Sequence, residues 1–287
     1  MSSALWGALC ALNLGVADFL ARFSTRAVGS LCAFFGVLLI STVAMSAWAL
    51  VNSPLLVWDT SRIWLLGLNG VATTVMTLLL YQGLARGPIG VVAPVVASHP
   101  VLVVLFWVIM GARPSTIQWF AMSMITVGVV IVSRSGKVAV SGDCPDSRAL
   151  RRTLWIATGA SIAYAVLVVA GQSAVPIYGE FQTMWFGRLA SFSTLLLVFL
   201  VRRERPAVPA RLWPLLGIQG TLDVLGYLFL FAGSRGDGAG IAAVTASTFG
   251  AVTVLLARIV LREPVSAWQW FGILMVFVGV AVVSGFS

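Results

Sequence analysis

Residues 229–284 read FLFAGSRGDGAGIAAVTASTFGAVTVLLARIVLREPVSAWQWFGILMVFVGVAVVS, and residues 79–133 read LLYQGLARGPIGVVAPVVASHPVLVVLFWVIMGARPSTIQWFAMSMITVGVVIVS. The two stretches carry glycines, prolines and Gln-Trp pairs in the same order and, apart from a one-residue gap, in the same register. The matched positions are Gly83 with Gly233, Gly90 with Gly240, Pro114 with Pro264, Gln118-Trp119 with Gln269-Trp270, Gly128-Val129 with Gly279-Val280 and Ser133 with Ser284. Chance similarity between apolar segments does not explain agreement across three consecutive runs, so the chain contains an internal repeat.

The composition of the 287 residues places most of the chain in lipid. It is 60% hydrophobic and 9% charged, with a mean hydropathy of +1.01, whereas a soluble domain carries about 25% charged residues. The net charge of +9 does not indicate a nucleic-acid-binding protein, because the basic residues punctuate long apolar runs and do not cluster on one face. Three cysteines without metal-ligand spacing predict neither a disulfide framework nor a metal site.

Ten apolar runs are each long enough to cross a bilayer, since about 20 helical residues span about 30 Å of hydrocarbon. We therefore predict an all-α membrane protein with ten transmembrane helices. A first five-helix repeat (residues 1–137) is followed by a polar cytoplasmic linker (138–152) and a second five-helix repeat (153–287). The runs lie near residues 4–22, 28–50, 62–83, 88–110, 115–133, 153–175, 181–201, 211–233, 239–260 and 266–285.

The distribution of Lys and Arg predicts how these helices are oriented. If the N-terminus lies outside, the cytoplasmic loops hold fourteen basic residues and the outer loops three, while Arg188 falls within a span. We expect a bacterial inner-membrane protein with both termini on the periplasmic side. Because five spans per repeat is an odd number, the second repeat is inverted relative to the first. Inverted repeats are typical of secondary transporters, whose substrate site lies near the midplane.

The junction before the last run carries a recognisable motif. Leu261-Arg262-Glu263-Pro264 is followed by Trp268-Gln269-Trp270-Phe271-Gly272. Together with ten spans in two repeats, this motif resembles the EamA-like ten-helix branch of the drug/metabolite transporter superfamily, over essentially the whole chain. The resemblance implies transport of a small molecule from a range that includes amino acids, sugars, nucleosides, quaternary amines and drugs. The first repeat departs from the pattern, because Arg113 stands where the second repeat has Glu263.

Nothing in the sequence indicates an enzyme or a bound cofactor. His99 is the only histidine and has no Glu or second His at helical spacing, and neither a G-x-S-x-G elbow nor a phosphate-binding loop occurs. The partners we expect are a small-molecule substrate and the lipid bilayer, with no nucleic acid. Both a monomer and a homodimer remain compatible with the sequence.

Polar residues inside the apolar runs are the candidates for a binding site, because ionisable groups in a bilayer are costly and mark function. A helix rise of 1.5 Å per residue puts Arg188 and Asp223 about 10 and about 12 Å below the outer membrane edge. Asp18 lies deeper, toward the cytoplasmic end of its run. Four further polar residues share the layer, at about 10 to about 13 Å: Asn13, Asn69, His99 and Tyr164.

We predict a zwitterion site in this layer. The Arg188 guanidinium would bind a carboxylate in a bidentate fork, and Asp223 would bind an ammonium group. Trp185 lies one turn from Arg188 and Tyr227 one turn from Asp223, so both would supply aromatic surface. The expected function is export or facilitated diffusion of amino acids or similar small zwitterionic metabolites by alternating access. A competing interpretation makes Arg188 and Asp223 a structural ion pair without a ligand.

Two other functions remain as alternatives. A cationic or quaternary amine would bind Trp185, Tyr164 and Tyr227 through cation–π contacts, but a pocket that contains Arg188 argues against it. The other is a lipid-handling flippase, or a membrane scaffold without a small-molecule path. A lateral opening flanked by basic residues would favour the flippase.

His99 and its surroundings have more than one interpretation. The ordinary pKa of histidine, near neutrality, would suit a coupling proton, and the position before Pro100 equally suits a hydrogen-bonded packing role. Pro94 and Pro100 predict a bend in the run 88–110. The run 239–260 has no proline, so we expect the first of the two to bend more readily. Small residues in both runs predict close packing against neighbouring helices.

Overall fold

The computed structural model describes residues 2–86, 92, 95–96, 99–111, 113, 115–134, 147–235, 238–261 and 266–285. Throughout these residues the regular structure is helical, without a strand, as expected for an all-α protein. The helices are α1 (Ser3–Asn52), α2 (Trp64–Arg86), α4 (Pro100–Ile109), α5 (Thr116–Arg134), α6 (Ser147–Arg202), α7 (Trp213–Gly233), α8 (Ala239–Ala246), α9 (Phe249–Leu261) and α10 (Ala267–Gly285), with a short 3-10 turn at Ala210–Leu212. Most of the expected linker, Pro94, Pro114 and the motif residues 262–265 lie outside the described residues.

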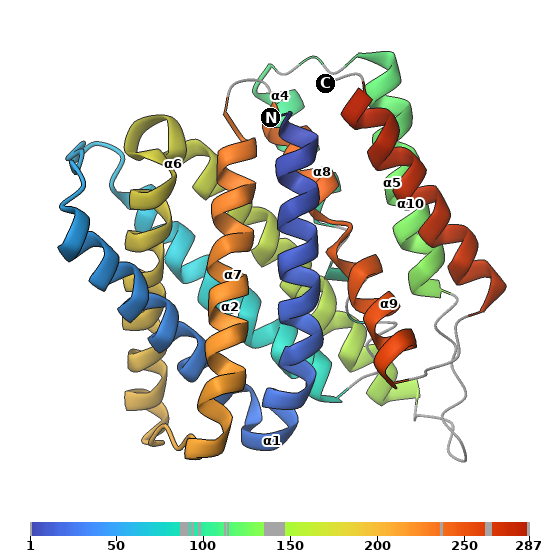
Figure 1. Ribbon diagram of the computed structural model, residues 1–287. Helices are drawn as coiled ribbons and strands as arrows, with labels where there is room; N and C mark the ends of the chain where they lie inside the picture. Colours follow the sequence, from blue (N-terminus) through green and yellow to red (C-terminus); the bar gives the residue numbers. More distant parts are fainter. Residues whose placement is uncertain are drawn as a thin grey trace.

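Several helices are long and apolar enough to cross a bilayer. Within the described residues five stretches meet this requirement: Ser3–Asn52, Trp64–Ala85, Arg151–Arg202, Ala210–Gly233 and Ala239–Leu261. α1 has 50 residues and α6 has 56. At 1.5 Å per residue, each is more than twice the roughly 30 Å of a hydrocarbon core. Both helices bend, and each therefore runs along the molecule twice (Figure 1).

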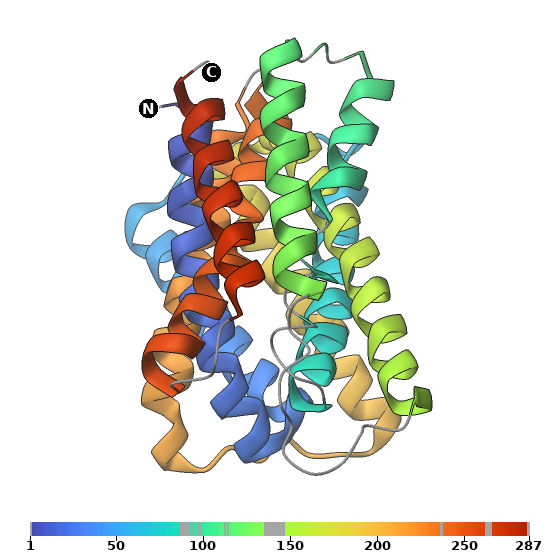
Figure 2. The same ribbon diagram turned by 90° about the vertical axis from the view of Figure 1, so that its right-hand side faces the viewer.

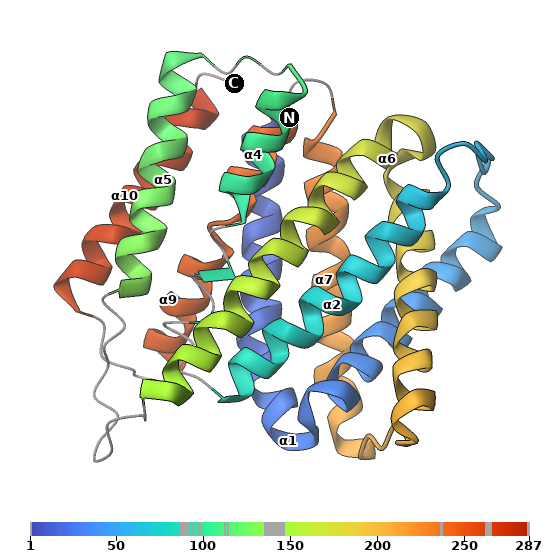
Figure 3. The same ribbon diagram turned by 180° about the vertical axis from the view of Figure 1, so that it is seen from behind.

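A single glycine makes each bend. Gly29 in α1 has φ 80° and ψ 163°, and Gly179 in α6 has φ 73° and ψ 168°. Only glycine adopts this region readily, so the backbone angles explain the residue type. A lack of space for a side chain does not explain the glycines, because an added Cβ would meet no atom within 4 Å at either position. The two glycines lie 150 residues apart, the same offset as Gly83 and Gly233, and the two bends lie at opposite ends of the molecule (Figures 1 and 3).

Each bent helix packs on a straight helix from the other half of the chain. α1 packs mainly against α7 and α6 against α2, while α5 and α10 lie side by side at one edge of the molecule (Figures 1 and 2). Glycines permit the close approach. A Cβ on Gly70 of α2 would come within 2.6 Å of the Gly187 carbonyl oxygen in α6, and a Cβ on Gly220 of α7 within 2.9 Å of the Val37 carbonyl oxygen in α1. Gly70 and Gly220 are again 150 residues apart, as are Val37 and Gly187.

The stretch 239–261 is broken although it contains no proline. α8 ends at Ala246 and α9 begins at Phe249. The hydroxyl groups of Thr245, Ser247 and Thr248 donate to carbonyl oxygens three or four residues earlier, and such bonds compete with those of the helix itself. The absence of proline was therefore a poor guide to bending in this stretch. Of the two prolines expected to bend the run 88–110, Pro94 lies outside the described residues and Pro100 is the first residue of α4.

The bend of α6 holds the loop that joins α1 to α2. The Val57 N–H donates to the Gln182 Oε1 at 2.9 Å, Gln182 Nε2 donates to the Val57 carbonyl oxygen at 2.8 Å, and the Tyr178 hydroxyl donates to the Asp59 carbonyl oxygen. α1 begins and α10 ends at the same end of the molecule (Figure 1). Placement of both termini on one side of a membrane requires this arrangement.

Candidate functional site

The two charged residues singled out in the sequence form an ion pair inside the molecule. A guanidinium nitrogen of Arg188, on the second half of α6, donates to a carboxylate oxygen of Asp223 on α7. The Arg188 side chain is 3% exposed and the Asp223 side chain 22%. Charges this deep in a protein are tolerated when they are paired, and α6 and α7 bring the pair together because they pack against each other.

Two small cavities flank the pair. The Arg188 cavity has a volume of about 10 Å³, and its polar lining consists of Asn69, Thr73, Arg188 and Tyr227. The Asp223 cavity has a volume of about 20 Å³, and its polar lining consists of Asp18, Thr77, Tyr81, Tyr164, Gln219, Asp223 and Tyr227. Because a single water molecule needs about 10–15 Å³, the site is closed to any larger solute.

A row of aromatic rings extends from the ion pair. The Arg188 guanidinium carbon lies 5.5 Å from the centroid of the Tyr227 ring, within the range of a cation–π contact. The Tyr227 and Tyr164 centroids are 6.3 Å apart, and the His99 ring stacks on Tyr164 at 3.9 Å and 10°. His99 is 2% exposed, its Nδ1 lies 3.1 Å from the Val96 carbonyl oxygen, and it lines neither cavity. His99 thus supports Tyr164 from outside the site.

Two side-chain amides fasten the straight helices to the bent ones. Asn69 of α2 donates to the Leu167 carbonyl oxygen of α6 at 3.0 Å. Gln219 of α7 accepts a hydrogen bond from the Ser24 hydroxyl of α1 at 3.0 Å and donates to the Tyr81 hydroxyl of α2. Both amides line a cavity, so the site is bounded by side chains whose positions are held by hydrogen bonds.

The structure brings together most of the residues expected at the site. Asn69, Tyr164, Arg188, Asp223 and Tyr227 line the two cavities, and three other candidates do not. The Trp185 indole N–H donates to the Ser46 hydroxyl of α1 at 3.0 Å. Asn13 donates to the Leu9 carbonyl oxygen of its own helix at 2.8 Å. The His99 ring stacks on Tyr164. An estimate of depth gives the height of a residue in the bilayer, not the direction in which its side chain leaves the helix.

Sequence reasoning missed several residues that line the cavities: Asp18, Thr73, Thr77, Tyr81 and Gln219. The depth estimate set Asp18 apart from the layer, but the structure places it in the same cavity as Asp223. The repeat offset was the available signal for three of the others. Asn69, Thr73 and Thr77 of α2 stand 150 residues before Gln219, Asp223 and Tyr227 of α7. Comparing the polar residues of the two halves in register would have found them.

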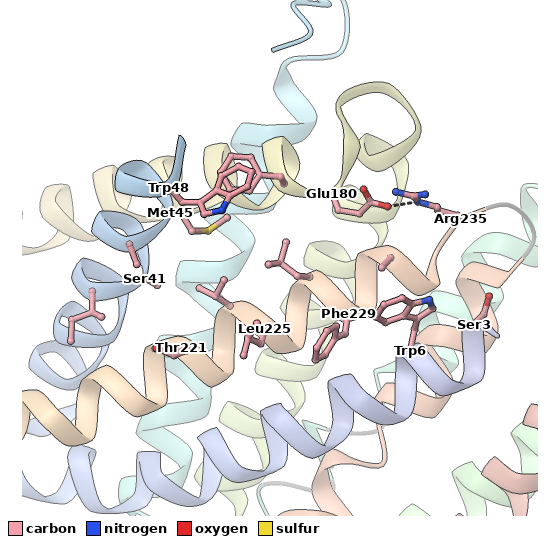
Figure 4. A pocket seen from close by; sticks show the side chains of 17 residues that line it. Ser3, Trp6, Ser41, Met45, Trp48, Glu180, Thr221, Leu225, Phe229 and Arg235 are labelled. Atoms are coloured by element: carbon pink, nitrogen blue, oxygen red, sulfur yellow. Dashed lines mark hydrogen bonds and ion pairs between the residues drawn. The ribbon is translucent and has the colours of Figure 1, made fainter. Parts of the chain in front are cut away.

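A large open groove lies outside this layer (Figure 4). It has a volume of about 920 Å³ and is lined by both halves of α1, by α7 and by the bend of α6, with mostly apolar side chains. At one end Arg235 forms an ion pair with Glu180, and this hydrogen-bonded guanidinium lowers the pKa of the Glu180 carboxyl. Arg235 is 74% exposed and Glu180 19%. Neither Arg188 nor Asp223 lines the groove.

Comparisons with known proteins agree with the fold. A model of the EamA-like transporter family matches residues 1–134 and 151–285. A crystal structure of a protein with 18% sequence identity aligns with a TM-score of 0.76 over 99% of this chain and 96% of that chain. At this identity the similarity concerns the fold alone. No match was found among curated proteins. Since the two family matches cover nearly all of both halves, this multi-pass membrane protein belongs to the EamA-like transporter family.

Proposed function

We propose that this protein is a secondary transporter that exports, or facilitates the diffusion of, amino acids or similar small zwitterionic metabolites. The observation that carries the proposal is the buried Arg188–Asp223 pair, which stands between two closed cavities lined by polar side chains. Membership of a transporter family supports a small-molecule substrate.

A zwitterion fits this pair by an exchange of partners. Its carboxylate replaces Asp223 on the Arg188 guanidinium, which can bind a carboxylate through two parallel N–H bonds. Its ammonium group replaces Arg188 on Asp223. Each of these two protein charges then keeps a partner, so neither is left unpaired in a poorly hydrated layer. A neutral solute offers no such exchange and would leave the pair closed.

A conformational change must precede binding, because the cavities hold no more than a water molecule. We propose alternating access by two inverted five-helix repeats, residues 1–137 and 153–287, that rock around the pair. The 150-residue offset supports this arrangement. Gly29 and Gly179 have nearly the same backbone angles, and the packing of α6 on α2 repeats that of α1 on α7. Ten spans with both termini in the periplasm complete the proposal.

A thermal-shift experiment on the purified full-length protein tests this function. A free amino acid such as L-leucine is compared with its methyl ester, which lacks the carboxylate, and its N-acetyl derivative, which lacks the ammonium group. Ligands that bind only the folded state raise its Tm. We expect a free amino acid, within a panel of such acids, to raise the Tm and neither of its blocked forms to do so. Equal stabilisation by all three forms, or by no member of the panel, contradicts a zwitterion site.

The groove favours a second candidate function, that of a lipid-handling flippase. It is an open groove along α1 and α7 with mostly apolar walls, and a basic residue, Arg235, lies at one end. The test uses vesicles reconstituted with the protein and a fluorescent phosphatidylethanolamine, quenched from outside with dithionite. Quenching of more than the outer leaflet, beyond that in protein-free vesicles, would support the flippase, and identical quenching would contradict it.

The position of Arg188 argues against a cationic amine in an aromatic pocket. The Arg188 guanidinium lies over the Tyr227 ring, so a positive charge already occupies the face that such a substrate would use. Trp185, the second ring required by that alternative, contacts Ser46 and lines neither cavity.

A further inference from the structure

The Asp223 cavity holds a second carboxylate that the Arg188–Asp223 exchange does not use. Asp18 of α1 lines this cavity together with Asp223 of α7. None of the described residues that line it is a Lys, Arg or His, and its remaining polar groups are three tyrosines, a threonine and a glutamine amide. Within the described part of the chain Asp223 has Arg188 as its ion-pair partner, whereas no such pair involves Asp18.

The carboxyl groups of the layer therefore outnumber its cationic groups. The described residues that line the two cavities supply one guanidinium, Arg188, and two carboxyl groups, Asp18 and Asp223. A ligand with one carboxylate and one ammonium group satisfies Arg188 and Asp223 and leaves Asp18 without a partner. A buried carboxylate without a cation is costly in a medium that solvates it poorly. The complement of the full set is a molecule with one negative and two positive groups.

The Arg188 cavity, which lies on the other side of the pair, suits the negative group of a ligand. Arg188 lines the Arg188 cavity with Asn69 and Thr73, and none of the described residues that line it carries a carboxylate. The Arg188 Nε is buried and has no hydrogen-bond partner among the described residues. This unpartnered N–H can donate to a carboxylate, as the two-point geometry of an Arg–carboxylate contact requires. The carboxylate of a ligand would thus lie on the side of Asn69, and its cationic groups would lie on the side of Asp18.

Building on the zwitterion site proposed above, we infer that the substrate is a basic amino acid, such as lysine or ornithine. The α-carboxylate binds Arg188 and the α-ammonium group binds Asp223. The side-chain cation reaches Asp18, so Asp18 sets the specificity for a second positive charge. Ordinary neutral amino acids bind the same pair but leave Asp18 unpaired.

Binding measurements on the purified full-length protein test this inference with three probes. L-Lysine carries all three charges, L-norleucine has the same carbon chain without the side-chain ammonium, and cadaverine lacks the carboxylate. We expect L-lysine to bind at least about tenfold more tightly than L-norleucine, the effect of one well-placed contact, and cadaverine to bind weakly. In Asp18→Asn the ratio of the lysine and norleucine affinities falls to about one. Asp59→Asn, in the exposed loop, is the matched control and keeps the wild-type ratio.

The outcomes separate this inference from the function on which it rests. If L-norleucine binds the wild-type protein as tightly as L-lysine, the inference is wrong and the zwitterion site stands. If norleucine binding releases a proton that Asp18→Asn no longer releases, Asp18 is a proton site and the inference is likewise overturned. If no amino acid binds at all, the proposed function itself fails. Should Asp18→Asn not fold, Asp18→Glu keeps the charge and must keep a preference for lysine.

Discussion

Arg188 of α6 and Asp223 of α7 bind each other at the place where a ligand would bind them, so the protein occupies its own candidate site. Tyr227, one turn from Asp223, lines the cavities on both sides of the pair. In the transport cycle proposed above, this contact must therefore open before a zwitterion binds.

Removal of either charge of the pair is expected to abolish stabilisation by amino acids. Asp223→Asn preserves the shape of the side chain and an oxygen that accepts from Arg188, so this variant should fold and lose the thermal shift. Arg188→Ala should also insert into the membrane and lose it. The double variant should not regain the shift, because both ligand contacts are gone. Thermal shift and detergent solubility measure the two effects.

The outcome that contradicts a binding role is specific. Breaking a purely structural buried pair costs about 3–5 kcal/mol, and removing both charges restores most of it. Aggregated single variants rescued by the neutral double variant would therefore leave Arg188 and Asp223 as a structural pair. Arg188→Lys is the finer probe, because it keeps the charge and loses the two-point geometry. It should fold and bind amino acids about tenfold more weakly.

His99→Gln is expected to lower stability without changing the pH dependence of transport. The His99 ring stacks on Tyr164 and lines neither cavity, so its loss removes packing and not a ligand contact. Transport is measured between about pH 5.5 and about pH 8, around the roughly 6.5 pKa of an ordinary histidine. Loss of the pH dependence in the variant would instead assign the coupling proton to His99.

Alanine at the two bends is expected to destabilise the protein. Gly29 and Gly179 have backbone angles that carry a penalty of about 1–3 kcal/mol for a residue with a side chain. Gly67 is the control, since it lies inside α2 and a Cβ there would meet no atom within 4 Å. Gly67→Ala should be neutral or stabilising by up to about 1 kcal/mol. Equal Tm values for all three alanine variants would contradict the strained-backbone account.

The pair at the end of the groove is expected to give a small, pH-dependent contribution to stability. Arg235 lowers the pKa of Glu180. The contribution is therefore fully present above the unfolded pKa of about 4.3 and is lost as the pH falls through the lower folded-state value. Because Arg235 is 74% exposed, the effect near neutral pH should be slight. Thermal melts of wild type and Arg235→Ala should converge at acidic pH, and a large difference that persists there would rule out this origin.

A reporter fused after Ser287 is expected to lie outside the cytoplasm. The prediction rests on the fourteen basic residues of one set of loops against three of the other. Alkaline phosphatase fused at this position should be active, and green fluorescent protein should not fluoresce. A fluorescent fusion together with inactive phosphatase would reverse the orientation and with it the side from which depths are counted.

The membrane class, the helical fold and the 150-residue offset between the two halves could be predicted from the sequence alone. Partition into lipid depends on the local run of apolar residues, and a span is a local property of about 20 residues. The ion pair could also be anticipated from the sequence, because Arg188 and Asp223 are charged residues inside apolar runs at similar estimated depths. The bend at Gly179 falls between the predicted spans 153–175 and 181–201, whereas the bend at Gly29 falls at the second residue of the predicted span 28–50.

Which polar residues come together depends on how the helices pack. Helix rotation, bending and tilt set the direction of each side chain, and these depend on packing between segments far apart in the chain. Asn13 and Trp185 were expected at the depth of the site, but Asn13 donates to Leu9 and Trp185 to Ser46, away from the cavities. Asp18 lines the Asp223 cavity although its estimated depth placed it below the other candidate residues. The close approach at Gly70 and Gly220 fixes how α2 and α7 face their partners. Hydropathy reports the burial of a segment in lipid, and only the packed helices determine which of its faces lines the site.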